Sequence, residues 1–420
     1  MHIIFVTTEL ATKNNSSGGL ATFTANIARI FFQHGHKTGI LLVTTKEQNI
    51  EFDEGIYLKN IYIDKKDWEE YDFVSKLYYP EDEKEAVLNR RELVKIRKAD
   101  LVRQEIEAHN KADKVDIVHF CNHGALSIMM RSNIPYIVRI SGYMNIYEGG
   151  ANTPYGSIVF ADNPLTISDE LEIHAMKKAD HVIVPSRLLA DITRENLAIN
   201  PTVLESPFIL SEDEWEDDIF CEKLSDKKYL LFFGTLKYLK GIQVIADLAE
   251  NFLGQNPEMC LVLAGNDMGL KEEDGSSVMA SDYVKKKAGK FADRVLYLGR
   301  LVREQMYPVV KGADLCIFPS RIENLSNTCI EAMALGKIVV ATNGASFEQL
   351  IEDRASGFLC ERDNPESYLN AVNEALEMSE EDKQKMILRA AERIRLLSPD
   401  VIYDKYLEFY EKVIKEWKNK

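Results

Sequence analysis

The sequence predicts an α/β protein made of two doubly wound domains, each built around a parallel sheet. At 420 residues the chain is long for a single hydrophobic core. Short apolar runs alternate with longer helical patterns, which is typical of a parallel sheet covered by helices on both faces. The alternation stops at an acidic stretch, residues 210–228, and then resumes. We therefore expect domains at residues 1–208 and 209–399, joined by a solvated linker.

The first domain opens with a buried strand, "HIIFVTT", followed by a helix, "GLATFTANIARIFFQHGH". Phe23, Ile27, Ile30 and Phe31 fall on one face of that helix, and Gly35 ends it. Four further apolar runs predict the other strands of this sheet. They are "TGILLVTT", "IVHF", "YIVRIS" and "HVIVPS".

The second domain begins at "KYLLFFG", residues 228–234, and repeats the architecture of the first without repeating its sequence. Its other strands are predicted at "MCLVLAG", "RVLYLG", "DLCIFPS" and "IVVAT". A last helix, within residues 400–420, follows Pro399 and carries a stripe of large apolar side chains, so it must pack on another part of the protein. The stripe consists of Tyr403, Tyr406, Leu407, Tyr410, Val413, Ile414 and Trp417.

Composition and charge argue against several classes of protein. The net charge of −16 argues against a broad nucleic-acid-binding or anionic-membrane surface. The six cysteines are scattered, with no spacing that suits a zinc site, so we expect reduced thiols and no metal. The N-terminus lacks the features of a signal peptide, and no apolar stretch reaches the roughly 20 residues that span a bilayer. A cytoplasmic protein is the expectation.

One segment departs from the acidic background. Residues 89–103, "NRRELVKIRKADLVR", hold six basic residues against two acids. A solvated helix face explains this pattern. The alternative is a surface that meets an anionic lipid or a phosphorylated acceptor, which would place the protein at the inner face of the membrane.

Two tandem domains of this type predict a ligand in the cleft between them, at the carboxyl ends of the strands. Gly18 and Gly19 directly precede the first helix, so its amides could face a phosphate or a sugar, although a plain tight turn would look the same. In "FFGTLKYLKGI" a strand ends at Gly234 and a helix starts near Gly241. Lysines in the turn between them could neutralise a diphosphate, or could be ordinary surface lysines.

The stretch "FPSRIENLSNTCIEAMALGK", residues 318–337, reads as a strand end, a loop and a helix, with Asn327 as the expected N-cap. The first amides of that helix would point into the cleft, ready for phosphate oxygens. Glu323 in the loop and Glu331 about one turn into the helix could each accept from sugar hydroxyls. The alternatives are an exposed loop acid for Glu323 and a helix-start acid favoured by the dipole for Glu331. Taken together, the groups suit a ligand made of ribose, diphosphate and sugar.

The segment "PSRIENLSNTCIEAMALGKIVVATNGASFEQLIEDRASGFL" resembles the donor-binding region of family 4 retaining glycosyltransferases, glycosyltransferase group 1, of the GT-B fold. The shared pattern is a Glu, seven residues, then Glu-Ala-Met and a Gly. Weaker similarity extends over the chain, through Gly18-Gly19, "GHKTGILL", "DIVHF", "ADHVIVPSRLLADI", "GTLKYLKG", "VLAGND", "VLYLGRL" and "GADLCIFPS". The resemblance implies two Rossmann-like domains facing each other across a cleft, with the last helix crossing back to the N-terminal domain.

The resemblance also implies an activity: metal-independent transfer of a sugar from a UDP- or GDP-sugar, with retention, to a glycan, lipid-linked or small-molecule acceptor. No cofactor is implied. By carry-over, Glu323 binds the transferred sugar and Lys240 the diphosphate, and these two are the expected catalytic residues. The other expected donor-binding positions are Gly18, Gly19, Gly234, Thr235, Lys237, Arg300, Leu301, Leu325, Ser326, Asn327 and Glu331, with Glu331 at the ribose and Arg300 and Leu301 at the base.

Two positions depart from the family pattern. Thr235 stands where many members have an Arg, so one diphosphate cation is missing, and we hypothesise that Lys237 replaces it. Ser141 stands where many members have a His near the reacting sugar, and His123 is the nearest candidate to fill that gap, although an ordinary loop histidine explains it as well. Acceptor contacts are expected in the N-terminal domain, including residues 141–165.

Other functions remain open on the sequence alone. A glycosidase also uses paired carboxylates, but it needs no phosphate cradle. A nucleotide-sugar epimerase on the same fold would need further acids in the cleft. A two-lobed, non-enzymatic sugar-binding protein would also close on a sugar, but is expected to carry an export signal.

Overall fold

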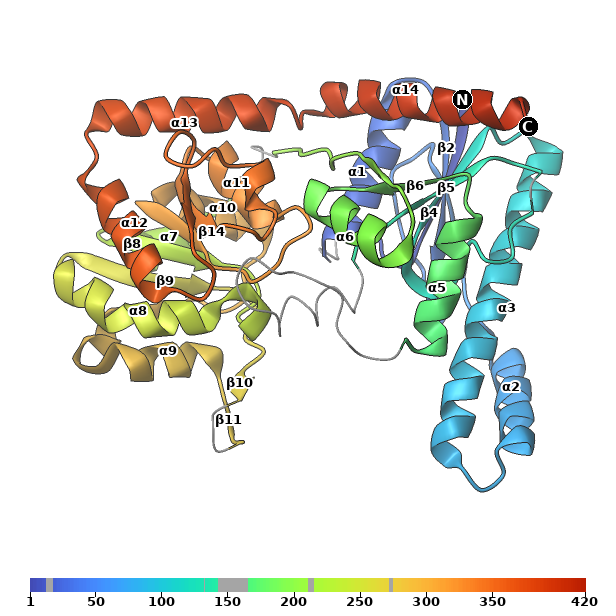
Figure 1. The fold of residues 1–420 in the computed structure, drawn as a ribbon, viewed down its shortest axis with the longest axis horizontal. Coiled ribbons are helices and arrows are strands. Elements are labelled where there is room, and N and C mark those ends of the chain that lie inside the picture. Colours follow the sequence, from blue (N-terminus) through green and yellow to red (C-terminus); the bar gives the residue numbers. More distant parts are fainter. Residues whose placement is uncertain (13–17, 132, 143–164, 211–214, 272–274) are drawn as a thin grey trace.

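The computed structural model describes residues 1–12, 18–131, 133–142, 165–210, 215–271 and 275–420. Within these ranges the chain forms two α/β domains, each with one fully parallel main sheet, as the sequence predicts. The domains lie side by side, and helices cover both faces of each sheet (Figure 1).

The sheet of the N-terminal domain has the order β3-β2-β1-β4-β5-β6-β7. The strand order reverses between β1 and β4, which is where a doubly wound sheet opens a crevice for a ligand. Every strand that the sequence predicts for this sheet is present. The bounds are His2–Thr7 (β1), Lys37–Val43 (β2), Tyr57–Ile61 (β3), Ile117–Cys121 (β4), Tyr136–Arg139 (β5), His181–Val184 (β6) and Thr202–Val203 (β7).

The sheet of the C-terminal domain has the order β12-β9-β8-β13-β14-β15 and reverses between β8 and β13. A small antiparallel ribbon, Leu270–Lys271 (β10) with Ser277–Val278 (β11), stands apart from it. The strands of the main sheet are Lys228–Phe233 (β8), Met259–Ala264 (β9), Val295–Tyr297 (β12), Leu315–Phe318 (β13), Ile338–Thr342 (β14) and Phe358–Cys360 (β15).

Helices follow the strands in both domains. In the N-terminal domain they are Gly19–Gln33 (α1), Lys65–Tyr78 (α2), Glu83–Ala112 (α3), Ile167–Lys178 (α5) and Arg187–Leu197 (α6). The later ones are Asp218–Lys223 (α7), Ile242–Gln255 (α8), Ala280–Ala288 (α9), Arg303–Gly312 (α10), Asn327–Ala334 (α11), Pro365–Glu377 (α12), Glu380–Arg395 (α13) and Pro399–Lys418 (α14). No helix in the described parts of the chain is both long and apolar enough to cross a bilayer.

Helix α14 returns to the N-terminal domain, where Tyr406, Tyr410 and Val413 of its apolar stripe are buried. Figure 1 shows α13 over the C-terminal domain and α14 continuing along the same edge across the N-terminal domain. The Tyr410 hydroxyl lies 2.6 Å from Nδ1 of the buried His119 on β4. At the crossing, the amide of Phe208 donates to the carbonyl of Leu397 at 2.8 Å, so the outgoing and returning chains run together.

The prediction of a solvated linker at 210–228 is wrong for its described second half. Residues Asp218–Lys223 form α7, which packs on α10. The Trp215 ring lies 5.8 Å from the ring of Tyr307, and Leu224 is fully buried. The acidic composition of this segment suggests a solvated linker. A high local charge does not, however, prevent a few large side chains from packing on a neighbouring core.

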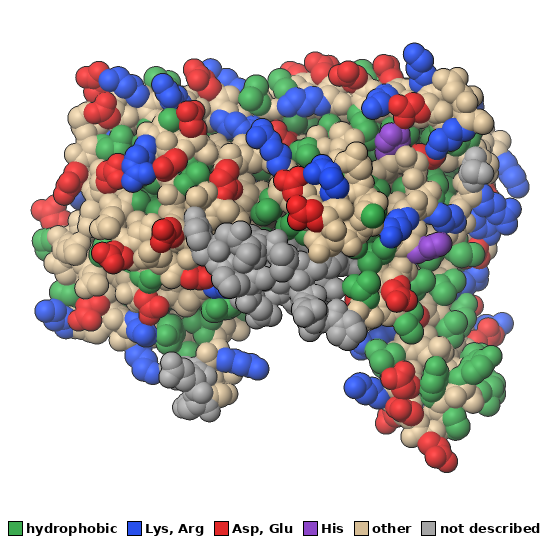
Figure 2. Space-filling model, in the orientation of Figure 1, with side chains coloured by type: hydrophobic (Ala, Val, Ile, Leu, Met, Phe, Trp, Pro, Cys, Tyr) green, Lys and Arg blue, Asp and Glu red, His purple; other side chains and the backbone are tan. Residues whose placement is uncertain are grey.

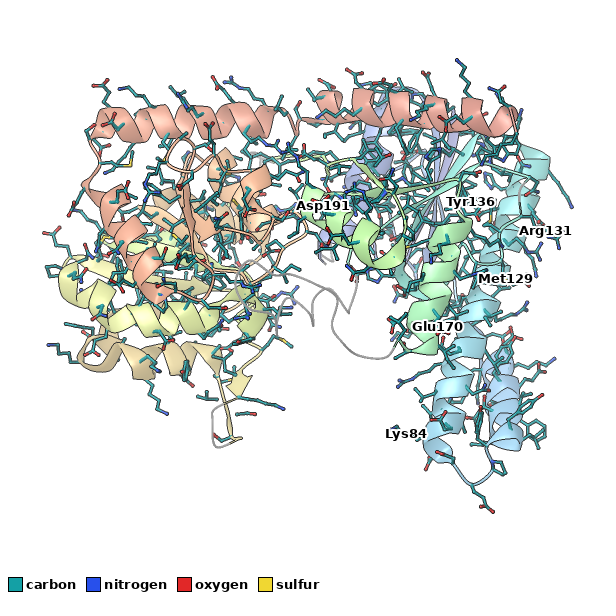
Figure 3. The ribbon with its side chains drawn as sticks, viewed as in Figure 1. Lys84, Met129, Arg131, Tyr136, Glu170 and Asp191 are labelled. Carbon is teal, nitrogen blue, oxygen red and sulfur yellow. The ribbon has the colours of Figure 1, made fainter. Side chains whose placement is uncertain are left out.

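Helices α2 and α3 form a hairpin that projects from the N-terminal domain (Figure 1), with Lys84 at its tip (Figure 3). Most basic groups in the 89–103 segment are used within the hairpin: Arg90 pairs with Asp72, and the Arg97 Nε lies 3.1 Å from an Asp67 oxygen. Helix α2 also exposes large apolar side chains beside its charged ones, including Phe73, Leu77 and Tyr78, and Figure 2 shows green side chains over this part.

Candidate active site between the domains

A cavity of about 260 Å³ lies between the two domains, at the carboxyl ends of their strands. Seven of its lining residues are among the predicted site residues: Gly19, Ser141, Lys240, Glu323, Leu325, Ser326 and Asn327. The sequence did not single out the other six, which are Leu20, Arg139, Pro185, Ser206, Asn324 and Thr328. The structure therefore brings together residues that are up to about 300 positions apart along the chain, from both walls of the cleft.

The N-termini of α1 and α11 face each other across this cavity. A Cβ added to Gly19 would lie 3.4 Å from Nδ2 of Asn327. Within the described residues no side chain caps the start of α1 at Gly18, so the first amides of this helix have no side-chain acceptor there and could meet a ligand. Two helix N-termini give the cavity two positive dipole ends, a combination that suits an anion such as a phosphate.

The N-cap of α11 is Ser326, and the prediction of Asn327 is wrong. The Ser326 hydroxyl accepts from the amide of Cys329 at 3.4 Å, and the Ser326 backbone is extended. Asn327 is the first helical residue, so its side chain is free to reach toward Gly19. Both residue types are good N-caps, and the shift by one position turns an expected capping group into a group that lines the cavity.

Lys240 and Glu323 form an ion pair in the wall of the C-terminal domain. The Ser320 hydroxyl donates to Glu323 Oε1 at 2.8 Å, and the Glu323 amide donates to the carbonyl of Ala345 at 3.1 Å. The side chain of Glu323 is only 12% exposed, so it is not the exposed loop acid of the alternative interpretation. The pair holds a carboxylate and an ammonium group ready at one end of the cavity.

The turn that carries Lys240 depends on Gly241. Lys240 ends a 3-10 turn, Tyr238–Lys240, and Gly241 follows with φ at 74°. A Cβ on Gly241 would lie 1.8 Å from the carbonyl oxygen of Pro319, the residue after β13. Only glycine allows these two backbones to approach so closely, which brings Lys240 next to the loop of Glu323.

Glu331 lies behind the cavity and not among its lining residues. It comes after the first turn of α11, so it is not a helix-start acid. Its side chain is 14% exposed, with an Arg303 nitrogen 3.6 Å from Oε1. Burial raises the pKa of Glu331 to about 7, and the charge of Arg303 opposes that rise only in part. This carboxyl therefore titrates near neutral pH.

The remaining predicted donor residues surround the strand ends of the C-terminal domain. Gly234 directly follows β8, with φ at 137°, and a Cβ there would lie 3.8 Å from Cγ2 of Thr328 on α11. Thr235 follows it. Arg300 and Leu301 come directly after Gly299, whose carbonyl accepts from the amide of Gly265. Arg300 is exposed, and Leu301 packs against the core.

Lys237 and His123 are also not among the residues that line the cavity. Lys237 borders a neighbouring hollow together with Met268 and Leu270. Burial lowers the pKa of Lys237, and the nearby charge of Lys240 lowers it further. The negative charge of Glu323 opposes both effects only in part. His123 begins the short turn His123–Ala125 after β4. Of the expected acceptor segment, residues 143–164 lie outside the described residues.

Arg139 and Asn324 are the main lining residues that the sequence analysis missed. Asn324 donates from its side chain to the carbonyl of Ser141 and so links the domains at the cavity. Arg139 donates to the hydroxyl of Ser141 and, at 2.9 Å, to that of Ser206. A sequence signal existed for Arg139, since a charged residue interrupts the apolar strand "YIVRIS". Asn324 gave no such signal, because polar loop residues are common.

Comparison with known proteins finds a family that is similar to the C-terminal part of the chain. The model of the family "Glycosyl transferases group 1" matches residues 213–393. The "Phosphatidylinositol N-acetylglucosaminyltransferase gpi3 subunit" of Schizosaccharomyces pombe is 23% identical, over 59% of this chain and 50% of that protein. The chain spans about half the length of such curated relatives.

Solved structures share the whole fold. Sucrose-phosphate synthase from Thermosynechococcus elongatus has a TM-score of 0.69 at 16% identity, covering 99% of this chain and 100% of that one. A second structure, "Trehalose-6-phosphate from E. coli bound with UDP-2-fluoro glucose", has a TM-score of 0.69 at 12% identity, covering 97% and 98%. Residues 213–393 are therefore similar to the group 1 glycosyltransferases, and the chain as a whole has the GT-B fold of these solved structures.

Proposed function

We propose that the protein is a retaining glycosyltransferase of family 4 that moves a sugar from a UDP- or GDP-sugar to an acceptor without a metal ion. The observation that carries the proposal is the single cavity in which the N-termini of α1 and α11 meet Lys240 and Glu323. The matched family, and the UDP-2-fluoro glucose bound to the similar E. coli protein, support a nucleotide-sugar donor.

In this proposal the ion pair changes partners when the donor binds. Lys240 turns from Glu323 to the diphosphate, next to the free amides of α11, and the carboxylate of Glu323 is released to accept from hydroxyls of the transferred sugar. As the bond between the anomeric carbon and the phosphate oxygen breaks, the negative charge on the diphosphate grows. Lys240 and the helix dipoles are already oriented toward that charge, so they stabilise it without reorganisation.

The new bond would form on the face that the leaving group vacates. The acceptor oxygen attacks the anomeric carbon, and its proton passes to an oxygen of the departing phosphate, which balances the reaction without a protein nucleophile. Glu331 would hold the ribose, and the loop at Arg300 and Leu301 the base. In place of the family's Arg, Lys237 would add positive charge from the edge of the site.

The test is incubation of the purified protein with UDP- and GDP-sugars, with and without candidate acceptors. Release of nucleotide only when an acceptor is present identifies a transferase, and product with the donor's anomeric configuration identifies retention. Full activity in excess EDTA supports metal independence. An isomerised sugar would instead mean an epimerase, free sugar from a glycoside a glycosidase, and binding without turnover a sugar-binding protein.

A lipid-linked acceptor is the part of the proposal that would bring the cytoplasmic protein to the inner face of the membrane. The support is the α2–α3 hairpin, whose exposed Phe73, Leu77 and Tyr78 could enter a lipid surface while most basic residues of 89–103 stay ion-paired within it. We expect the protein to float with liposomes, and Phe73→Ser with Leu77→Ser to abolish this. If the parent protein does not float with neutral or anionic liposomes, the acceptor is a glycan or a small molecule.

The pH dependence of donor binding tests the role of Glu331. Only the carboxylate accepts from both ribose hydroxyls, and with a pKa of about 7 its ionised fraction rises about tenfold between pH 6 and pH 8. We therefore expect the donor Kd to fall about tenfold over this range. Titration calorimetry checks this. Glu331→Gln should bind weakly with no such pH dependence, and Arg303→Met should move the transition to higher pH.

The free energy of unfolding of the unliganded protein should fall as the pH rises, whereas the affinity for the donor should rise. Because burial raises the pKa of Glu331 above its unfolded value, its contribution to stability is fully present below pH 4.5, the unfolded value, and is lost as the pH rises through about 7. A flat donor Kd between pH 6 and pH 8 would contradict the ribose role, even if the stability followed this course.

A further inference from the structure

Arg139 is a buried cation without a carboxylate partner among the described residues. It lies at the end of β5 and is 4% exposed. Its guanidinium donates to the hydroxyls of Ser141 and Ser206, lies 3.8 Å from the centre of the Phe23 ring, and leaves its buried Nε without a hydrogen-bond acceptor. Neutral hydroxyls and a ring compensate only part of the loss of hydration of a full positive charge.

The carboxylates that could neutralise Arg139 are occupied elsewhere. Glu205, next to Ser206 in the chain, accepts from the side chain of Gln349 at 2.6 Å and pairs with Arg393. Glu323, which lines the same cavity, is paired with Lys240. The described residues therefore provide a positive charge at the N-terminal wall of the cavity and no anion to balance it.

Arg139 lies at the cavity between the domains, so its positive charge acts on a ligand bound there. Arg139 and its partners Ser141 and Ser206 all line the cavity, together with Gly19 at the open start of α1. They form the wall that faces Lys240 and the start of α11. An anionic group between the walls would meet a guanidinium, two hydroxyls and free amides, which together suit phosphate or carboxylate oxygens.

We propose that Arg139 binds an anionic oxygen group, a phosphate or a carboxylate, at the N-terminal wall of the cavity. The inference rests on the proposed function and deepens it. Ser141 and Thr235 are neutral at two positions where many members of the family have a His and an Arg, and Arg139 would supply positive charge at this site. The anion has two sources: the diphosphate of the donor, held from both walls at once, or an acidic group on the acceptor. Arg139 meets the substrate in either case.

Binding of simple anions tests this assignment and separates the two sources. In the first arm, the Kd values of UDP and GDP are measured for the wild type, Arg139→Met and Arg139→Lys. In the second arm, the Kd of inorganic phosphate is measured with the tighter nucleotide at saturation, which fills the donor site. Arg393→Met is the matched control, since it also removes a largely buried arginine, which pairs with Glu205 next to Ser206 in the chain but lies outside the cavity.

We expect Arg139→Met to weaken one of these two affinities about 10- to 100-fold, and Arg139→Lys to restore part of it. A loss in the first arm assigns the donor diphosphate, and a loss in the second arm assigns an acidic acceptor. Arg393→Met should change neither. Unchanged affinities in a folded Arg139→Met variant would overturn the proposal and leave Arg139 a structural link between β5 and α1.

Two further results are informative. If Arg139→Met does not fold, Arg139→Lys still decides the question, because a purely structural arginine would leave the anion affinities of the folded lysine variant unchanged. If the wild type binds neither UDP nor GDP, the proposed function fails, while phosphate binding alone still tests Arg139. A wild type that binds none of the three anions removes the basis of the assignment.

Discussion

Lys240→Ala should lower kcat about 10²- to 10³-fold, the effect of removing one preorganised group that stabilises developing negative charge. Lys240 is paired with Glu323 and lines the cavity that holds the two helix N-termini. Without the ammonium group, the diphosphate of the proposed mechanism keeps the helix dipoles but loses the positive charge of Lys240. The loss should be larger in kcat than in donor affinity, because the charge grows as the bond breaks. Steady-state kinetics with a defined donor and acceptor provide the measurement.

Lys237→Ala is the matched control for Lys240→Ala. It removes the same charge three positions away, from a side chain that borders the neighbouring hollow. If Lys237 replaces the missing arginine of the family, its variant should weaken donor binding several-fold, about 1 kcal/mol for a partly exposed charge. An unchanged donor Kd would reject that hypothesis for Lys237. A Lys240→Ala variant with kcat within threefold of the wild type would refute the role of the ion pair in catalysis.

Gly241→Ala should destabilise the C-terminal domain by about 2–5 kcal/mol, as the sum of a left-handed alanine and an overpacked contact. The new methyl group would lie 1.8 Å from the carbonyl oxygen of Pro319, so β13 or the turn has to move. Either movement separates Lys240 from Glu323. Urea denaturation followed by the fluorescence of Trp215, which packs in this domain, measures the loss.

Gly35→Ala separates the contribution of the backbone angle from that of the contact. Gly35 has φ at 79°, close to the 74° of Gly241, but nothing lies within 4 Å of its added Cβ. Gly35→Ala should lower the free energy of unfolding by only about 1–2 kcal/mol. Gly35 lies far from the cavity, so activity should be retained. Equal losses in the two variants would show that the contact with Pro319 relaxes easily and that the close approach of the backbones is not what holds Lys240.

The sequence predicted the strongly periodic elements and the residues with unusual chemistry. Every strand expected from an apolar run is present, because parallel strands buried on both faces need uninterrupted apolar side chains. Glu323, Lys240 and the start of α11 were found because charges at a strand end and a helix start are unusual in that pattern. The residues that line the cavity from the C-terminal domain were thus largely visible before the structure.

The elements that the sequence did not predict depend on contacts between distant parts of the chain. Strands β7 and β15, with two and three residues, are too short for a periodic pattern and exist because a neighbouring strand pairs with them. Helix α7 was hidden by its acidic surroundings. The choice between Ser326 and Asn327 as N-cap depends on where the loop leaves β13, and propensity does not distinguish them.

The partners of Arg139 show the same limit. Ser206 and Ser141 are 65 positions apart, and only the parallel arrangement of β5, β6 and β7 brings them to the same wall. The charged residue inside an apolar strand was present in the sequence, but its significance required the knowledge that no described carboxylate faces it. Absence of a partner is a property of the fold and cannot be derived from one segment.

The return of α14 to the N-terminal domain has a consequence for the order of events during synthesis. Its buried residues, Ile402, Tyr406, Tyr410 and Val413, complete a core whose N-terminal members were translated about 200 to 400 residues earlier. Domains usually fold in order as they leave the ribosome. Here the first domain has to wait, with His119 and the adjacent apolar face uncovered, until the second domain has been made. A chaperone that shields this face during the interval should therefore increase the yield of folded protein.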